Sequence, residues 1–334
     1  MLIVLIVHFL FFYFGCYFFD KNLNRAKISA FVFVLISFFI RVIIPLEWNA
    51  DFSYYSHRNY DFEILKPLND VMVSLLYNVM FYFTNSKELS VKLFSYLVFV
   101  LSTSFYVWLI FTQLPKYKKI FLFALTYFLF TFTLLRNGPG YELVFLYFYY
   151  LFNKNKTFFW LLFLAVTFHY SSIIAFFCEI KFKYLKVYLP ISLLLFFAFV
   201  KILNVDVSIF TIKLMDYFNN KYDFNLNHFL WFIMVLGFYV LIYLENNEKG
   251  ILKRALFFLV AYLIAILFNP VLAFRVSFYF ILFYCSIPVI KPFFTTRISY
   301  LNRLSLLFVV FHVIAFIKCH KAVNMDVMLF SLSS

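Results

Sequence analysis

Apolar runs of membrane-spanning length follow one another along almost the whole chain. A bilayer core needs about 20 consecutive apolar residues in a helix, and within lipid only helices or closed barrels satisfy every backbone polar group. The sequence therefore predicts an all-α integral membrane protein, a polytopic bundle of roughly 10–13 transmembrane or half-membrane helices that forms a single domain over residues 1–334. The expected helices occupy residues 1–19, 28–46, 90–113, 119–135, 141–152, 157–168, 171–180, 184–202, 227–244, 251–268, 272–290 and 303–319.

Four apolar segments are too short to cross a bilayer without tilting or pairing. The segment 69–83 also contains polar residues, and we expect it to be re-entrant or interfacial. The segments 141–152, 157–168 and 171–180 are similarly short. Broken helices of this kind are tolerated where they line a cavity.

The basic residues indicate how the chain is oriented in the membrane. With the N-terminus outside, the segment 69–83 not crossing and the chain turning at His169, 17 of the 29 Lys and Arg residues fall in or at the edge of short inside loops. The positive-inside rule favours this arrangement. Arg136, His169 and Arg275 then all lie at the outer ends of their helices, together with the polar segments 47–68 and 203–226. The expected inside loops are 20–27, 114–118, 153–156, 181–186, 245–254 and 291–302.

Composition excludes several other classes of protein. The chain is 65% hydrophobic, whereas soluble domains are about 45–50% apolar. Its net charge of +14 lies in short loops, so we expect membrane lipids and no nucleic acid as partners. No phosphate-binding glycine loop, zinc-ligand spacing or nucleophile elbow is present, and no metal or cofactor is expected. The cysteines lie in apolar runs and are expected to be small buried residues: Cys16, Cys178, Cys285 and Cys319.

An isolated arginine stands beside the most unusual stretch of the chain, Leu135-Arg136-Asn137-Gly138-Pro139-Gly140-Tyr141-Glu142. Two of the five glycines flank a proline here, which predicts a break between two membrane helices. A guanidinium keeps its charge and its planar fork fits phosphate or carboxylate. We therefore interpret Arg136 as a ligand for the diphosphate of a lipid-linked sugar. The alternative is a snorkelling or helix-pairing arginine.

A second isolated arginine, Arg275, follows another expected helix break at Asn269-Pro270. Two arginines at the same membrane depth could hold a diphosphate through bidentate hydrogen bonds. In a site of low dielectric constant they would also stabilise negative charge that develops on a leaving group. The alternative is that Arg136 and Arg275 are two independent snorkelling residues.

Three further residues are candidates for proton transfer. His169, in Thr167-Phe168-His169-Tyr170-Ser171-Ser172, has a side chain that titrates near neutrality and suits a general base or a phosphate donor. Asp51 and Glu142 could deprotonate an acceptor hydroxyl. The alternatives are a structural hydrogen bond for His169 and a solvated loop for Asp51. Glu142 could instead pair with Arg136, and Tyr54 and Tyr55 could stack on sugar rings.

These segments, taken in order, resemble the bacterial polysaccharide polymerases of the O-antigen polymerase (Wzy) class, especially the EpsG-like branch. The resemblance covers roughly residues 45–285. Its most specific part is the segment that begins at Phe168-His169 and continues through Ser171. The segments that carry it are Asp51-Phe52-Ser53-Tyr54-Tyr55 with Lys66-Pro67-Leu68, Leu135-Arg136-Asn137, Phe168-His169-Tyr170-Ser171-Ser172-Ile173-Ile174, and Arg275 with Tyr279-Phe280.

The chain departs from the family pattern at two places. Lys66 stands where the family usually has an acidic residue before proline, which leaves Glu63 as a stand-in. The Gly138-Pro139-Gly140 stretch interrupts a helix that often continues past the arginine.

The resemblance implies a glycosyltransferase that needs no metal or nucleotide sugar. It would transfer a growing glycan from undecaprenyl diphosphate to a lipid-linked repeat unit, at the outer face of the bacterial inner membrane. Arg136 and Arg275 would then hold the leaving diphosphate, and His169, Asp51 or Glu142 would provide the base. A chain-length regulator and a flippase are the expected protein partners.

Three other functions are compatible with some of these sequence features. Another lipid-sugar-dependent glycosyltransferase or an O-antigen ligase would use the same donor but make a single transfer. A polysaccharide transporter or flippase would be expected to have duplicated halves and charges deep in the bundle, whereas the charges here collect at one face. A membrane O-acetyltransferase would need its histidine on the side from which the acyl donor arrives.

Overall fold

The computed structural model describes residues 2–44, 46, 71–134, 137–179, 226–246 and 248–290. The predicted site residues Asp51, Tyr54, Tyr55 and Arg136 lie outside these ranges, as do the expected helices 184–202 and 303–319.

All regular elements in these ranges are helices, which confirms the predicted fold class. Among them α2, α5 and α13 are long and apolar enough to cross a membrane. The elements are α1 (Leu2–Phe19), α2 (Leu23–Ile43), α4 (Val71–Thr84), α5 (Lys87–Ile110), α6 (Lys116–Phe128), the π-helix η2 (Leu129–Thr133), α7 (Asn137–Lys154), α8 (Phe159–Phe168), the 3₁₀ turn η3 (Tyr170–Ser172), α9 (Ile173–Glu179), α12 (Leu226–Glu245), α13 (Lys249–Phe268) and α14 (Pro270–Ser286).

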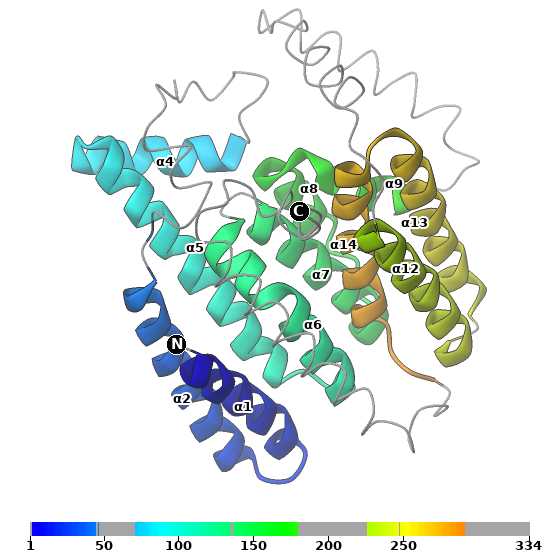
Figure 1. Ribbon diagram of the computed structural model, residues 1–334, viewed down its shortest axis with the longest axis horizontal. Helices are drawn as coiled ribbons and strands as arrows, with labels where there is room; N and C mark the ends of the chain where they lie inside the picture. The colour runs from blue at the N-terminus through cyan, green and yellow to red at the C-terminus, as the bar shows by residue number, and fades with distance from the viewer. Residues whose placement is uncertain are drawn as a thin grey trace, which may run out of the picture.

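The helices pack around α7, as Figure 1 shows. The hairpin of α1 and α2 lies on one side of the bundle, and α12, α13 and α14 lie on the other. Between them, α7 packs against α5, α8 and α14. Polar side chains cap the N-termini of α2 and α5. Asn22 accepts a hydrogen bond from the Arg25 amide, and Ser86 accepts one from the Leu89 amide.

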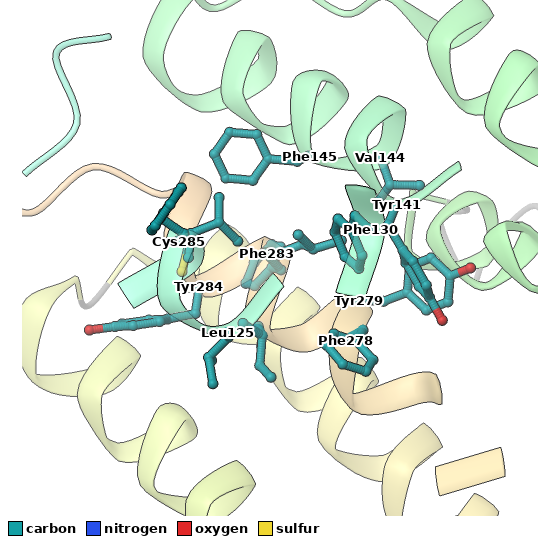
Figure 2. Close-up of a cluster of buried hydrophobic side chains, with 14 of the residues drawn as sticks. Leu125, Phe130, Tyr141, Val144, Phe145, Phe278, Tyr279, Phe283, Tyr284 and Cys285 are labelled. Atoms are coloured by element: carbon teal, nitrogen blue, oxygen red, sulfur yellow. The ribbon is translucent and has the colours of Figure 1, made fainter. Parts of the chain in front are cut away.

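Aromatic side chains fill the centre where η2, α7 and α14 meet. Phe130 stacks on Tyr141 with ring centroids 5.1 Å apart, and Tyr141 also contacts Tyr279 at 4.8 Å. Figure 2 shows Tyr141 and Tyr279 together at one end of this cluster and Tyr284 at the other. The cluster therefore connects the two ends of the bundle through apolar packing.

One end of the bundle, here called the basic end, gathers the termini that carry the basic residues. Lys116, at the start of α6, pairs with Asp20 just after α1 at 3.2 Å. Asn153 near the end of α7 donates to the Ser286 carbonyl at the end of α14, at 2.7 Å. Since the positive-inside rule assigns such residues to the cytoplasmic side, we expect the basic end to face the cytoplasm.

The prediction that Gly138-Pro139-Gly140 forms the helix break is wrong. These three residues belong to the first turn of α7, which begins at Asn137 and has 18 residues where a shorter helix from residue 141 was expected. A proline is tolerated in a first turn because its missing N–H would have no partner within the helix. The structure instead ends the preceding helix after η2, at Thr133.

The expectation that Lys118 lies in a loop is also wrong. Both Lys118 and Lys119 lie in α6 and are buried. The Lys118 ammonium pairs with Glu245 at the end of α12, at 2.8 Å, and donates to the carbonyls of Tyr284 and Ile287 in the α14 region. These contacts join three helices at the basic end.

The short helix α4 has 14 residues, or about 21 Å at 1.5 Å per residue, which is too short to cross a bilayer core. It packs against α5 and α8. Figure 1 shows it lying crosswise over the end of the bundle opposite the basic end. Its re-entrant or interfacial position in a membrane stays a prediction.

Candidate active site at the end opposite the basic residues

Three segments that are distant in the sequence meet at the end opposite the basic end, which we call the site end. They are the start of α7, the turn from α8 into η3, and the first turns of α14. Each contains one motif singled out in the sequence. The fold thus brings together residues that are more than 100 positions apart along the chain.

Gly140 allows the first turn of α7 to approach the His169 turn. A Cβ atom at this position would lie 3.2 Å from Ser172 Oγ, 3.3 Å from the Ala165 carbonyl oxygen and 3.4 Å from His169 Cβ. The first two distances are tighter than most real contacts, so a larger side chain would push the helices apart. The glycine is therefore explained by close packing beside His169.

His169 ends α8 and leads into η3. Its backbone is extended, with φ −158° and ψ 120°, and its amide donates to the Ala165 carbonyl at 2.9 Å. The Ser172 amide donates in turn to the His169 carbonyl at 3.0 Å. Backbone hydrogen bonds thus define the corner between α8 and η3, and the imidazole there is half-buried.

Tyr279 connects α14 to this corner. Its hydroxyl lies 2.6 Å from Ser171 Oγ and 3.1 Å from Ser172 Oγ. Arg275 is four residues earlier on α14, so the two side chains share one face of that helix. The helix starts with Asn269 as its cap, whose side chain accepts from the Leu272 amide, and with Pro270 in the first position. The predicted break before Arg275 is confirmed.

Gly138 fixes the corner between η2 and α7. A Cβ atom here would lie 2.7 Å from the Phe130 carbonyl oxygen, which is closer than such atoms can approach. The Gly138 amide donates to the Leu134 carbonyl at 2.9 Å, which connects the end of η2 to the first turn of α7. Leu134 and Asn137, the described neighbours of Arg136, therefore both belong to the site end.

Glu142 lies on the face of α7 that lines a cavity between α4, α5, α7 and α8. The residue is buried, and its Oε1 makes no hydrogen bond within the part of the chain that the structure describes. Pro139 lines the same cavity, and so does Phe168, which precedes His169. Glu142 therefore faces the cavity that Pro139 and Phe168 also line, while its predicted pairing with Arg136 stays untested.

Sequence reasoning missed Arg41, which lies in the last turn of α2 and is buried. Its guanidinium carbon is 5.5 Å from the ring centre of Phe132 in η2 and 5.7 Å from that of Tyr96 in α5. These distances are typical of cation–π contacts. The signal was available, because Arg41 is a single charge within an apolar run, as Arg136 and Arg275 are.

A family model for the EpsG family matches residues 30–331, which include every motif described above. The protein is a member of the EpsG family. EpsG proteins are polysaccharide polymerase-like membrane proteins, so the family expected from the motifs is confirmed. No curated protein and no solved structure matches this EpsG chain.

The site end of this EpsG protein is polar and aromatic. Among the described residues, no group of three or more His, Cys, Asp or Glu side chains is arranged to hold a metal ion. The groups placed there are the guanidinium groups of Arg41 and Arg275, the imidazole of His169, the carboxyl of Glu142 and the hydroxyl of Tyr279. Such groups suit binding of an anion and transfer of a proton.

Substituting Tyr279 with phenylalanine should lower the free energy of unfolding by about 1–2 kcal/mol, because the variant loses the hydroxyl that bonds both serines. Ser172 is fully buried and cannot turn to water for a replacement. Unfolding in detergent measures the change. Tyr243→Phe is the control, since Tyr243 is 58% exposed on α12. Equal stability of the two variants would contradict a structural role for the Tyr279 hydroxyl.

Proposed function

We propose that this protein is a polysaccharide repeat-unit polymerase. It transfers a growing glycan from undecaprenyl diphosphate to a lipid-linked repeat unit at the outer face of the bacterial inner membrane. The observation that carries the proposal is the meeting of the Gly140, His169 and Tyr279 segments at the end of the bundle opposite the basic end. The match to the EpsG family supports it.

The reaction sets clear demands on the site. The bond between the anomeric carbon and the diphosphate oxygen breaks, and a bond from the acceptor hydroxyl oxygen to that carbon forms. The diphosphate leaves with the electron pair, and the hydroxyl proton passes to a base. A site for this transfer therefore needs cations beside the leaving group and a base beside the acceptor.

The cations of the site end are suited to the leaving group. Arg275 lies on the face of α14 that reaches the His169 corner, and Arg136 is proposed from the sequence alone. In this proposal both arginines bind the diphosphate through paired hydrogen bonds. Arg41 adds a third positive charge beside η2 and strengthens the field at that end.

The base is proposed among three residues. His169 lies beside Gly140, and Glu142 lines the cavity that Phe168 also lines. Asp51, with Tyr54 and Tyr55 as sugar-stacking residues, is proposed from the sequence. In this scheme a flippase supplies the repeat units to the same face, and a chain-length regulator sets the number of transfers.

Deletion of the gene in its own host tests the function. We expect the ladder of surface polysaccharide on a gel to collapse to a single repeat unit, and wild-type protein to restore it. His169→Ala and Arg275→Ala should each fail to restore the ladder, with losses of about 100-fold or more in polymer. Arg25→Ala is the control, because Arg25 is exposed at the basic end and should restore the ladder fully.

The other outcomes each overturn the proposal in a different way. A ladder of normal length with altered modification would indicate an acyltransferase. Loss of every repeat, including the first, would indicate an earlier transferase or a flippase. Restoration by folded, membrane-inserted His169→Ala and Arg275→Ala at wild-type level would remove these residues from the site.

A further inference from the structure

A cavity of about 890 Å³ lies between α4, α5, α7 and α8, beside the candidate active site. Both α5 and α8 pack on α7, and α4 packs on α5 and α8 at the site end. Residues of α4, α5, α7 and α8 line the cavity. Figure 1 shows the arrangement of these four helices. Nothing in the proposed chemistry of the site end accounts for a space of this size.

The cavity is a long groove that runs parallel to the helices. On α7 its lining extends from Pro139 to Tyr150, which is about 16 Å at 1.5 Å per residue. On α5 it extends from Leu97 to Trp108, over the same length. Because both helices run from the site end toward the basic end, the groove starts at the active site and descends into the bundle.

The chemistry of the lining changes along the groove. Glu142, the one carboxylate among the described residues that line the groove, is buried and lies one turn from the site end. Below it the walls are apolar and aromatic, with Leu146, Trp108 and Phe158 as examples. Such a lining suits a hydrocarbon chain whose polar head stays at the site end.

The groove is also accessible from its flank. Leu101 on α5 is 42% exposed and Trp160 on α8 is 60% exposed, and both line the cavity. In a membrane these side chains meet lipid, so a chain within the bilayer can enter sideways between α5 and α8 while its head group remains at the surface.

We propose that this groove binds the isoprenoid chain of the lipid-linked glycan donor and so places the donor diphosphate at the site end. The inference rests on the proposed function for the identity of the donor. The position of the isoprenoid chain is inferred from the structure. The end of the groove nearest the site end is lined by Pro139 and by Phe168, the residue before His169. A lipid held there delivers its head group to the residues that act on it.

The test uses purified full-length protein and a photoreactive isoprenoid diphosphate that carries no sugar. Labelling should map to α5, α7 and α8, and an excess of undecaprenyl diphosphate should suppress it while phosphatidylglycerol does not. Leu146→Trp, which places a larger side chain in the groove, should reduce labelling by about tenfold or more. Phe163→Trp is the control, because Phe163 is 67% exposed on α8 and does not line the cavity.

A second variant keeps the proposal testable if Leu146→Trp fails to fold. Leu101→Trp fills the groove from α5, at a position that is already partly exposed and tolerates a larger side chain. Labelling unchanged in both folded variants, or suppressed equally by phosphatidylglycerol, would overturn the proposal.

The readout also separates this inference from the proposed function. The probe has no sugar to transfer, so labelling does not require polymerisation. Specific labelling in the groove together with an unchanged polysaccharide ladder on gene deletion would overturn the polymerase assignment and leave an isoprenoid-binding groove. A lost ladder with unchanged labelling of the variants would overturn the groove alone.

Discussion

Replacing Glu245 with alanine is expected to lower the free energy of unfolding by about 3–5 kcal/mol, because it leaves a buried ammonium without its counter-charge. The carboxylate pairs with Lys118 at 2.8 Å, and both side chains are fully buried. Its other oxygen accepts hydrogen bonds from Tyr117 at 2.5 Å and from Tyr284 at 3.1 Å. The substitution therefore removes the carboxylate of α12 that contacts both α6 and α14.

Unfolding in detergent measures this loss, with Glu248→Ala as the control. Glu248 is exposed three residues further along the chain and makes no side-chain cap, so its removal should change stability by less than about 0.5 kcal/mol. A Lys118→Met, Glu245→Leu double variant should be more stable than Glu245→Ala, since it leaves no unpaired charge. Equal stability of Glu245→Ala and Glu248→Ala would show that the pair does not hold the basic end together.

Replacing Gly138 with alanine should reduce polymer formation by about 100-fold, because a displacement of about 1 Å at a catalytic site has effects of that size. The new methyl group would lie 2.7 Å from the carbonyl oxygen of Phe130. That oxygen belongs to the backbone, so relief requires η2 or α7 to move. The motion would shift the first turn of α7, which packs beside the His169 corner through Gly140, and the overpacking should also cost about 1–3 kcal/mol of stability.

Gly237→Ala is the matched control for this prediction. Gly237 also lies in a helix, α12, but a Cβ atom there would meet nothing within 4 Å. Alanine should be neutral or stabilise the helix by up to about 1 kcal/mol, with no change in the polysaccharide ladder. Full activity of Gly138→Ala would show that the corner between η2 and α7 can shift without cost.

Position 138 requires glycine because a side chain would collide with the Phe130 backbone, and not because the backbone adopts an unusual conformation. This explains why Gly-Pro-Gly wrongly predicted a helix break. Neither Gly138 nor Gly140 has a positive φ angle. Gly-Pro-Gly predicts a break when its residues are judged by backbone freedom alone. The structure uses the same residues to start α7 and to bring two other segments close to it.

Local properties of the sequence sufficed for much of the fold. The apolar runs located most helices to within a few residues, and the short lengths of α8 and α9 were expected. The motifs around His169 and Arg275 correctly indicated the ends of helices and the EpsG family. Each of these depends on hydrophobic length, charge or motif order, which neighbouring residues specify without reference to the rest of the chain.

The burial of Lys118 and Arg41 could not be predicted from neighbouring residues in the sequence. Lys118 was expected in a loop because it lies between two apolar runs, at residues 90–113 and 119–135. Its burial depends on Glu245, which is 127 positions away, and on carbonyls of the α14 region that are more distant still. The charge of Arg41 within an apolar run was visible in the sequence, but its contacts with Phe132 of η2 and Tyr96 of α5 depend on the packing of α2.

The sequence by itself determined that this protein is a helical membrane protein of the EpsG family, because hydrophobic length and motif order are properties of short segments. Only the tertiary structure decided that Gly140 contacts the His169 corner, that Tyr279 bonds Ser171 and Ser172, and that Glu142 faces a groove. These contacts join residues from separate helices. They form only when several apolar faces pack at once, and no single segment encodes that arrangement.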